Sequence, residues 1–333
     1  MAYTNIDDPS AYFQAFTYTG NGTNRSITLD GNSDLQPDLY WYKTRSSSNY
    51  HYLADSSRGT TKYIYPNDSL AEGTVASAYV QSFDTNGVTL GGGDSGTNTN
   101  GTTFANWVWK ANGGTNQGSN YQVNTTSGFS IGTYTGNRAS VVTANHGLGA
   151  KLDFLLIKPT SAVGPWVAWH KSDPTKVMFL DTTDAAFGYG AYFDAAPNTN
   201  TSSFSVGDAG ATNAAGVTYL FYGFAEKQGY SKFGKYVGNG NANGPFVYTG
   251  FKPEFVIVKR SDSANNWIIT DNARGINGAN PRLYADLTAA EGSAADYIDH
   301  LSNGFKIRTS AGSMNTSGGT YIYMAFAENP FVT

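Results

Sequence analysis

Two copies of an Asp-x-x-Arg-Gly motif contain the most distinctive charged residues of the sequence, one starting at position 55 and one at position 271. An aspartate and an arginine at this spacing can form an ion pair that stabilises a turn, or together they can clamp a polar ligand. We favour the ion pair and keep the ligand clamp as the alternative. The candidate ligand contacts of this kind are Asp55, Arg58, Asp271 and Arg274.

An aromatic and polar cluster, Trp166-Val-Ala-Trp169-His170, has side chains suited to binding a sugar. Aromatic faces stack on the apolar C–H surfaces of sugar rings, while Asn, Asp and His satisfy the hydroxyl groups. In the favoured alternative Trp166 fills the core, because Tyr50 and Trp267 occupy comparable places in related segments. Trp166, Trp169 and His170 are thus candidate ligand contacts of a second kind.

The residues needed for most kinds of catalysis are missing or wrongly spaced. There is no cysteine, the four histidines lack metal-ligand spacing, and no Gly-x-Ser-x-Gly elbow occurs. The glycines from Gly91 to Gly96 match a dinucleotide pattern but precede Thr-Asn-Thr-Asn, a poor start for a helix. We therefore predict no cofactor, no metal and no enzymatic activity. An arginine beside an aspartate also keeps that carboxyl ionised, which disfavours a glycosidase acid, although 25 acidic residues leave a carboxylate pair open.

The composition points to a polar but weakly charged surface. Only 14% of residues are charged, whereas Asn, Thr, Ser and Gly abound beside 23 Tyr and 19 Phe. Such a surface suits contact with other polar, uncharged surfaces, or it reflects an all-β protein whose loops need small residues. The net charge of −4 with no basic block argues against nucleic acid. The sequence contains no run of 18 apolar residues, so we predict no membrane insertion. The first residues lack the features of a secretion signal.

The elements that must position these residues occur three times along the chain. An acidic residue, four mostly apolar residues and a lysine recur at 38–43, 153–158 and 254–259, each after a Gly-Asn segment. Each copy ends in an aromatic strand, at 104–109, 219–224 and 321–326. The period near 100 residues is the length of one small β-sandwich. We therefore predict an all-β protein of three tandem antiparallel β-sandwich repeats, each about 100 residues long.

The predicted organisation has five parts. They are an N-terminal arm (1–15) that docks on a neighbour, repeat one (16–111), a Gly/Asn/Ser/Thr linker (112–128), repeat two (129–227) and repeat three (228–333). Asn86-Gly87 and Asn303-Gly304 predict tight hairpin turns. Helix is expected only as one or two turns within 287–301 and 69–77.

The closing aromatic strands give a register that can be tested. We expect Trp109, Phe224 and Phe326 to lie in the core, with Val108 on the opposite face of its strand. Trp107 shares a face with Trp109 and should also point inward, though it should be less fully buried.

Several segments resemble uncharacterised virion proteins of marine tailed bacteriophages of the cyanophage type. The resemblance spans nearly the whole chain. The segments that carry it are Met1–Thr4, Asp8–Phe13, Asp55–Gly59, Ser82–Gly87, Phe104–Lys110, His146–Gly149, Gly244–Phe251 and Tyr321–Pro330. This family is described as concanavalin A-like or tail-fibre-like, which implies a concanavalin A-like or jelly-roll sandwich and a place on a virion. It supplies no catalytic residues.

The expected function is that of a non-enzymatic virion surface protein, a tail-fibre or adhesin component contacting host-surface glycan. The alternatives are a capsid decoration or other structural protein, and a depolymerase of surface polysaccharide. The expected partners are further copies of the chain in a homo-oligomer such as a trimer, other virion proteins and a glycan. The protein would be made in the host cytoplasm without a signal peptide and assembled into the particle.

Overall fold

The computed structural model describes residues 4–75, 79–92, 96–116, 120–138, 141–275, 277, 281–292 and 297–330. Within these ranges the protein is all-β, with 6% helix and 43% strand, so the all-β part of the prediction is confirmed. Helix is confined to α1 (Gly210–Asn213), α2 (Gly312–Asn315) and the 3-10 turns η1 (Pro9–Ala11), η2 (Gly190–Tyr192) and η3 (Pro197–Thr199) in the part described. None of these helices is long or apolar enough to cross a membrane.

Three large antiparallel sheets share one order of strands. In each, the first strand of a segment pairs with its last strand, which pairs with the strand carrying the recurring lysine. The first sheet is β1 (Phe13–Thr19), β9 (Thr103–Trp109), β3 (Leu39–Thr44) and β4 (His51–Asp55). The second is β10 (Tyr121–Asn124), β11 (Phe129–Thr135), β18 (Thr218–Phe224), β13 (Phe154–Pro159), β14 (Val167–His170), β15 (Lys176–Phe179) and β16 (Phe187–Gly188). The third is β19 (Ser231–Val237), β26 (Thr320–Pro330), β21 (Phe251–Arg260), β22 (Ile268–Asp271) and β23 (Leu283–Tyr284).

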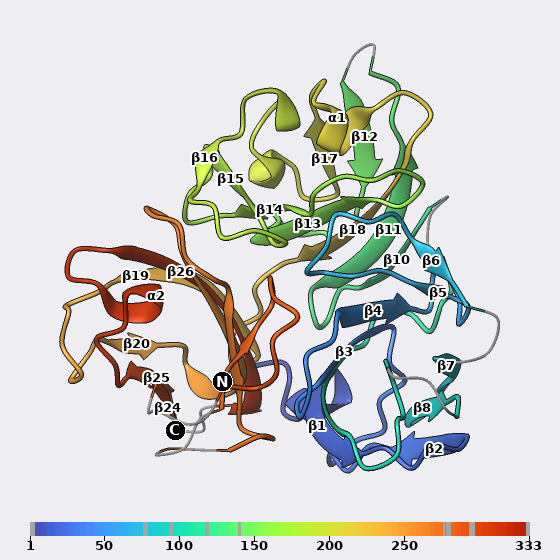
Figure 1. Ribbon diagram of the computed structural model, residues 1–333. Coiled ribbons are helices and arrows are strands. Elements are labelled where there is room, and N and C mark those ends of the chain that lie inside the picture. Colours follow the sequence, from blue (N-terminus) through green and yellow to red (C-terminus); the bar gives the residue numbers. More distant parts are fainter. Residues whose placement is uncertain are drawn as a thin grey trace.

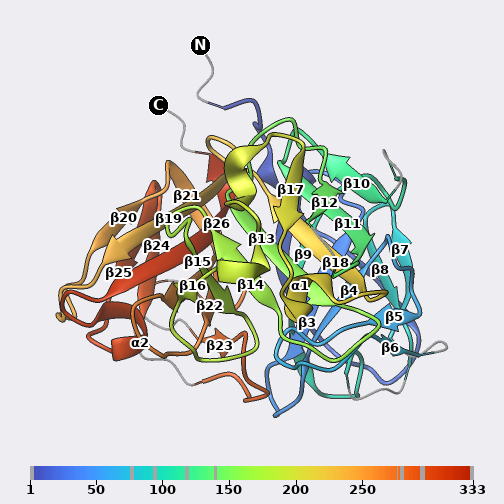
Figure 2. The same ribbon diagram turned by 90° about the horizontal axis from the view of Figure 1, so that it is seen from above.

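Smaller sheets lie on the outer sides of the large ones (Figures 1 and 2). They are β2 (Arg25–Thr28), β8 (Gly87–Leu90) and β7 (Val80–Asp84); β12 (Val142–Asn145) and β17 (Ser203–Val206); and β20 (Phe246–Tyr248), β25 (Gly304–Ile307) and β24 (Ile298–Leu301). The short pair of β5 (Lys62–Tyr63) and β6 (Gly73–Thr74) instead lies beside β4, where Leu53 bridges Ile64. The two predicted Asn-Gly turns close the β7–β8 and β24–β25 hairpins, where Asp84 pairs with Gly87 and Leu301 with Gly304.

The three large sheets surround one central core, which gives the three-lobed shape of Figure 1. Trp109, Phe224 and Phe326, one from the last strand of each sheet, meet there. Their ring centroids are 6.4 Å (Trp109–Phe224), 5.6 Å (Trp109–Phe326) and 5.8 Å (Phe224–Phe326) apart. The predicted inward register of these residues is confirmed. Aromatic rings bury about 150–250 Å² each, so this junction contributes a large apolar contact between the sheets.

Each large sheet uses its opposite face for a separate core against its small sheet. Val108 lies between Trp107 and Trp109 in the strand, so its side chain points to the opposite face of the sheet. There it packs in the core of the first lobe, as expected. Trp107 is as fully buried as Trp109, so the expectation of weaker burial was wrong. Phe255 of the third sheet packs against Trp107, with the two ring centroids 5.7 Å apart.

The predicted helices within 287–301 and 69–77 are absent from the described parts of those ranges, and residues 76–77 and 293–296 lie outside them. Strand β24 and the short strand β6 occupy these segments instead. An isolated bridge between Gly292 and Arg282 holds the first segment in extended form. Short-range strand pairing, β24 with β25 and β6 with β5, and backbone hydrogen bonds from Glu72 to Thr160 and from Glu291 to Arg45 thus override a weak helical preference.

The N-terminal arm packs on its own chain. Ile6 enters the central core, and the Thr4 hydroxyl donates to the Gln228 carbonyl at 2.6 Å. The range predicted as a linker contains β10, which pairs with β11 as the edge of the second sheet. Residues 1–3 of the arm and 117–119 of the linker lie outside the described residues, as do residues 93–95 of the glycine pattern.

Candidate functional site

The two Asp-x-x-Arg-Gly motifs form the ion pairs that we favoured. Arg58 Nε lies 2.6 Å from Asp55 Oδ2, and Arg274 Nε lies 2.7 Å from Asp271 Oδ2. The backbone N–H of each arginine also donates to the same aspartate, at 3.0 and 3.1 Å. Each aspartate therefore closes the turn after its strand, β4 or β22, while it neutralises the arginine.

These pairs are buried where two sheets meet. Asp55 accepts a hydrogen bond from the Tyr222 hydroxyl of the second sheet at 2.8 Å. Asp271 accepts one from Trp107 Nε1 of the first sheet at 2.9 Å. Burial disfavours the charged form of Arg58, but Asp55, Tyr222 and Glu72 together outweigh it, and the pKa of Arg58 is raised. The motif residues thus join neighbouring sheets.

In the second sheet His170 occupies the position that Asp55 and Asp271 occupy in the other two sheets. All three residues lie twelve positions after the recurring lysine. The His170 Nε2 lies 3.1 Å from the Tyr323 carbonyl oxygen of the third sheet. Burial lowers the pKa of His170 to about 3, so the ring is neutral at pH 7 and donates to this carbonyl. All three sheets therefore make a polar contact to the next sheet from one equivalent position.

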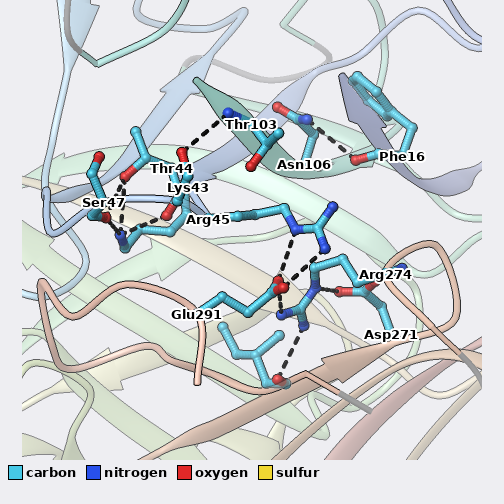
Figure 3. A network of polar contacts seen from close by, with 12 residues as sticks. Phe16, Lys43, Thr44, Arg45, Ser47, Thr103, Asn106, Asp271, Arg274 and Glu291 are labelled. Carbon is cyan, nitrogen blue, oxygen red and sulfur yellow. Dashed lines mark hydrogen bonds and ion pairs between the residues drawn. The ribbon is translucent and has the colours of Figure 1, made fainter. Parts of the chain in front are cut away.

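A further ion pair joins a loop of the first lobe to a loop of the third, as Figure 3 shows. Arg45 Nε lies 2.8 Å from Glu291 Oε2, and its second nitrogen lies 2.9 Å from Glu291 Oε1. Glu291 also contacts Arg274 at 3.2 Å. Burial raises the pKa of Glu291, but hydrogen bonds from Arg45 and the charge of Arg274 outweigh it, and the net pKa is lowered.

The recurring lysines are fully buried and bind backbone carbonyls. Lys158 Nζ donates to the Ser69 carbonyl at 2.9 Å and to Gly164, and Lys259 Nζ donates to the Thr183 carbonyl at 2.9 Å and to Asn265. Ser69 and Thr183 each belong to the preceding lobe. Lys43 differs, because its ammonium group bonds Thr44 (2.7 Å to the carbonyl) and Ser47 within its own loop (Figure 3).

Equivalent backbone hydrogen bonds repeat at all three junctions. One set is Gly164 to Ser69, Asn265 to Thr183 and Asn49 to Thr288, each at 2.8 Å. A second set is Glu72 to Thr160, Ala186 to Ser261 and Glu291 to Arg45, at 2.8–2.9 Å. Because the last junction returns from the third lobe to the first, the contacts form a closed ring. Buried backbone groups are thereby satisfied between lobes as well as within them.

Raising the pH should stabilise the fold through these lysines. Burial lowers the pKa of Lys43, Lys158 and Lys259 to about 8 from 10.5. Between these values the unfolded chain binds more protons than the folded one, so the free energy of unfolding rises with pH. We expect a gain of about 1 kcal/mol per lysine between pH 7.5 and 9.5, after allowance for solvent screening.

Urea unfolding at the two pH values measures this gain. Lys158→Met should flatten the pH dependence, whereas Lys151→Met, at an exposed position, should leave it unchanged. Equal slopes for the two variants would contradict the linkage.

The aromatic candidates are core residues. Trp166 Nε1 donates to the Tyr65 carbonyl of the first lobe at 2.7 Å, and Trp169 Nε1 donates to the Pro174 carbonyl at 3.1 Å. Both rings are fully buried. Tyr50 was expected to be the equivalent of Trp166 in the first sheet. The equivalent residue is His51, which lies opposite Lys43.

All seven sequence-predicted contact residues thus take part in internal contacts. Asp55, Arg58, Asp271, Arg274, Trp166 and His170 lie between lobes, and Trp169 lies in the core of the second lobe. A direct role for them in ligand binding stays a prediction.

An open hollow of about 550 Å³ at the junction of the first and third lobes is lined by two carboxyl groups, Glu254 and Glu328. Glu254, the third acid of the recurring pattern, accepts a hydrogen bond from the Ala15 N–H at 2.7 Å and lines the hollow with Glu328. Burial raises the pKa of Glu254 well above its usual range, the hydrogen bond opposes this, and the charge of Glu328 adds to it. Lys252 lies 2.7 Å from Glu328. Among the described residues no group of three or more His, Asp or Glu is arranged to hold a metal.

A sequence family described as a domain of unknown function, DUF7483, matches residues 8–330. The chain belongs to this family. No curated protein matches it. The DUF7483 match runs from the 3-10 turn η1 to the end of β26, so it covers all three lobes and the ring of contacts between them.

Sequence reasoning missed the partners of the candidate residues. The sequence did not point to Tyr222 or Arg45, although each contacts a charged group across a junction. The available signal was the constant offset of the aspartates and His170 from the lysines. That offset identifies equivalent positions, but it does not identify what they touch.

Proposed function

We propose that this DUF7483 protein is a non-enzymatic surface component of a phage particle, in which a rigid scaffold presents polar loops and strands to a glycan. The observation that carries the proposal is the use of the buried charged groups. The Asp–Arg pairs, His170 and two of the recurring lysines connect one lobe to the next. These groups therefore support the scaffold and leave contact with partners to its outer surface.

The finer fold belongs to the same proposal. We infer three tandem sandwich repeats of concanavalin A-like or jelly-roll type, because the three large sheets have one strand order and each has its own outer core. The place on a virion, assembly into an oligomer and contact with other virion proteins rest on the resemblance of the sequence to phage virion proteins. A capsid decoration or other structural role is the alternative within this class.

A second function, polysaccharide depolymerase, is favoured by the hollow beside Glu254 and Glu328. A carboxyl group of raised pKa that shares a hollow with a second carboxyl group resembles the acid and base pair of glycosidases. However, Glu254 already accepts the Ala15 N–H, and Lys252 pairs with Glu328, so both groups have internal partners.

We expect the protein to bind polysaccharide without cutting it. The purified chain is incubated with dextran, β-glucan, galactan and bacterial O-chain polysaccharide, and both retention and new reducing ends are measured. Retention without new ends is the expected result. New reducing ends that disappear in Glu254→Gln or Glu328→Gln, but persist in the exposed control Asp262→Asn, would establish the depolymerase instead.

A further inference from the structure

The outer strands β2, β12 and β20 occupy equivalent places in the three lobes. β2 pairs with β8, β12 with β17 and β20 with β25. In these pairs Thr28 is opposite Gly87, Asn145 is opposite Ser203 and Tyr248 is opposite Gly304. The middle residue of each strand is buried and its neighbours on both sides are exposed. This alternation aligns the outward positions of the three strands.

Only the third lobe has aromatic rings at these outward positions. The first lobe has Ser26 and Thr28, and the second has Thr143 and Asn145. In the third lobe Phe246 is 46% exposed and Tyr248 is 53% exposed. The fold therefore forms this strand twice with small polar residues at the positions where the third lobe has rings.

A polar hollow of about 290 Å³ adjoins the second ring. Tyr248 lines it with Gln228, Lys232 and Glu226, at the joint between the second and third lobes. Lys232 lies 2.6 Å from Glu226, which neutralises much of the charge there. The Gln228 side chain is exposed at the rim and can both donate and accept hydrogen bonds.

We propose that Phe246 and Tyr248 form a platform for adjacent sugar rings of a polysaccharide, with the hollow beside Tyr248 receiving the hydroxyl groups of one of them. This inference rests on the proposed glycan-binding function and names its site. The two aromatic rings lie two residues apart on one face of a strand, a separation of roughly 7 Å along the strand. This spacing fits successive sugar rings of a linear polysaccharide better than a single compact ligand. The apolar ring faces cover sugar C–H surfaces, and the amide, ammonium and carboxylate groups satisfy hydroxyls.

A protein partner is the less favoured occupant. A stable protein interface buries about 800 Å² on each side, far more than two half-exposed rings supply. A glycan needs only a short row of contacts, and weak single sites become strong when many copies are displayed.

The test substitutes the residues that the first lobe already has. The double variant Phe246→Ser/Tyr248→Thr reproduces Ser26 and Thr28, so it should fold, and its melting temperature should stay close to that of the wild type. Val237→Thr, which removes a different exposed apolar side chain of the third lobe (58% exposed), is the matched control. Affinity is measured by electrophoresis in gels containing dextran, β-glucan, galactan or bacterial O-chain polysaccharide.

We expect at least one gel to retard the wild type and Val237→Thr equally, and the double variant to bind at least about tenfold more weakly. Equal retardation of wild type and double variant would place the glycan elsewhere and overturn the platform, while the binding function would stand. If no polysaccharide retards the wild type, both the platform and the proposed function fail. A change of oligomeric state in the double variant, with glycan binding unchanged, would make the strand an interface between copies and would also overturn the proposal.

Discussion

Replacing Arg274 by methionine should lower the free energy of unfolding by roughly 3–5 kcal/mol. The guanidinium is fully buried and contacts Asp271, Glu291 and the Ile269 carbonyl. Without the arginine, the Asp271 carboxylate stays buried but loses its positive partner. From another lobe it keeps the hydrogen bond that Trp107 Nε1 donates. An uncompensated charge in the interior costs more than the ion pair itself contributes.

Urea unfolding of Arg274→Met measures this loss, and Arg308→Met is the control. Arg308 pairs with Asp299 at 3.2 Å, but its side chain is 42% exposed, so we expect a loss of about 0–1 kcal/mol. Arg58→Met should resemble Arg274→Met, because Arg58 is buried against Asp55 and Glu72. Losses of similar size for the Arg274 and Arg308 variants would show that the junction does not depend on the buried pair.

Replacing Trp109 by alanine should also cost roughly 3–5 kcal/mol. Its ring lies 4.9 Å from Phe13, 5.8 Å from Phe255 and 5.6 Å from Phe326, so truncation opens a cavity at the centre of the three lobes. Because rings from several lobes line that cavity, local collapse should refill little of it.

Trp109→Phe is the informative control. The Trp109 Nε1 is buried without a hydrogen-bond partner in the described part of the chain, so phenylalanine removes an unsatisfied donor while it keeps a ring in place. We expect a loss below about 1.5 kcal/mol for this variant, measured by urea unfolding beside the alanine variant. A small loss for Trp109→Ala would mean that the lobes are stable without the shared core.

Much of the secondary structure follows from local patterns in the sequence. The acid-x4-Lys segments are strands, the Asn-Gly pairs are hairpin turns, and the aromatic segments are closing strands with the expected inward face. These features depend on the alternation of side chains and on turn conformations, which neighbouring residues determine. The helices predicted within 287–301 and 69–77 failed because short-range strand pairing and backbone hydrogen bonds to other lobes outweigh a weak local preference.

The candidate site divides in the same way. The Asp–Arg ion pairs span three residues, so the sequence alone was enough to favour them. The contact of Asp55 with Tyr222 joins residues 167 positions apart, and that of Asp271 with Trp107 joins residues 164 apart. Nothing in the local sequence indicates these contacts, and they are the reason that the charged motif lies inside the protein.

The sequence by itself determined an all-β chain with a recurring strand, a recurring lysine and two Asp–Arg turns, since each depends on residues close together in the chain. Only the tertiary structure decided that the three sheets close into a ring, that the lysines and motif residues are buried at its junctions, and that Trp107 is as covered as Trp109. The physical reason is that burial and pairing depend on what the far segments bring to each side chain. Those segments meet only when the third lobe returns to the first.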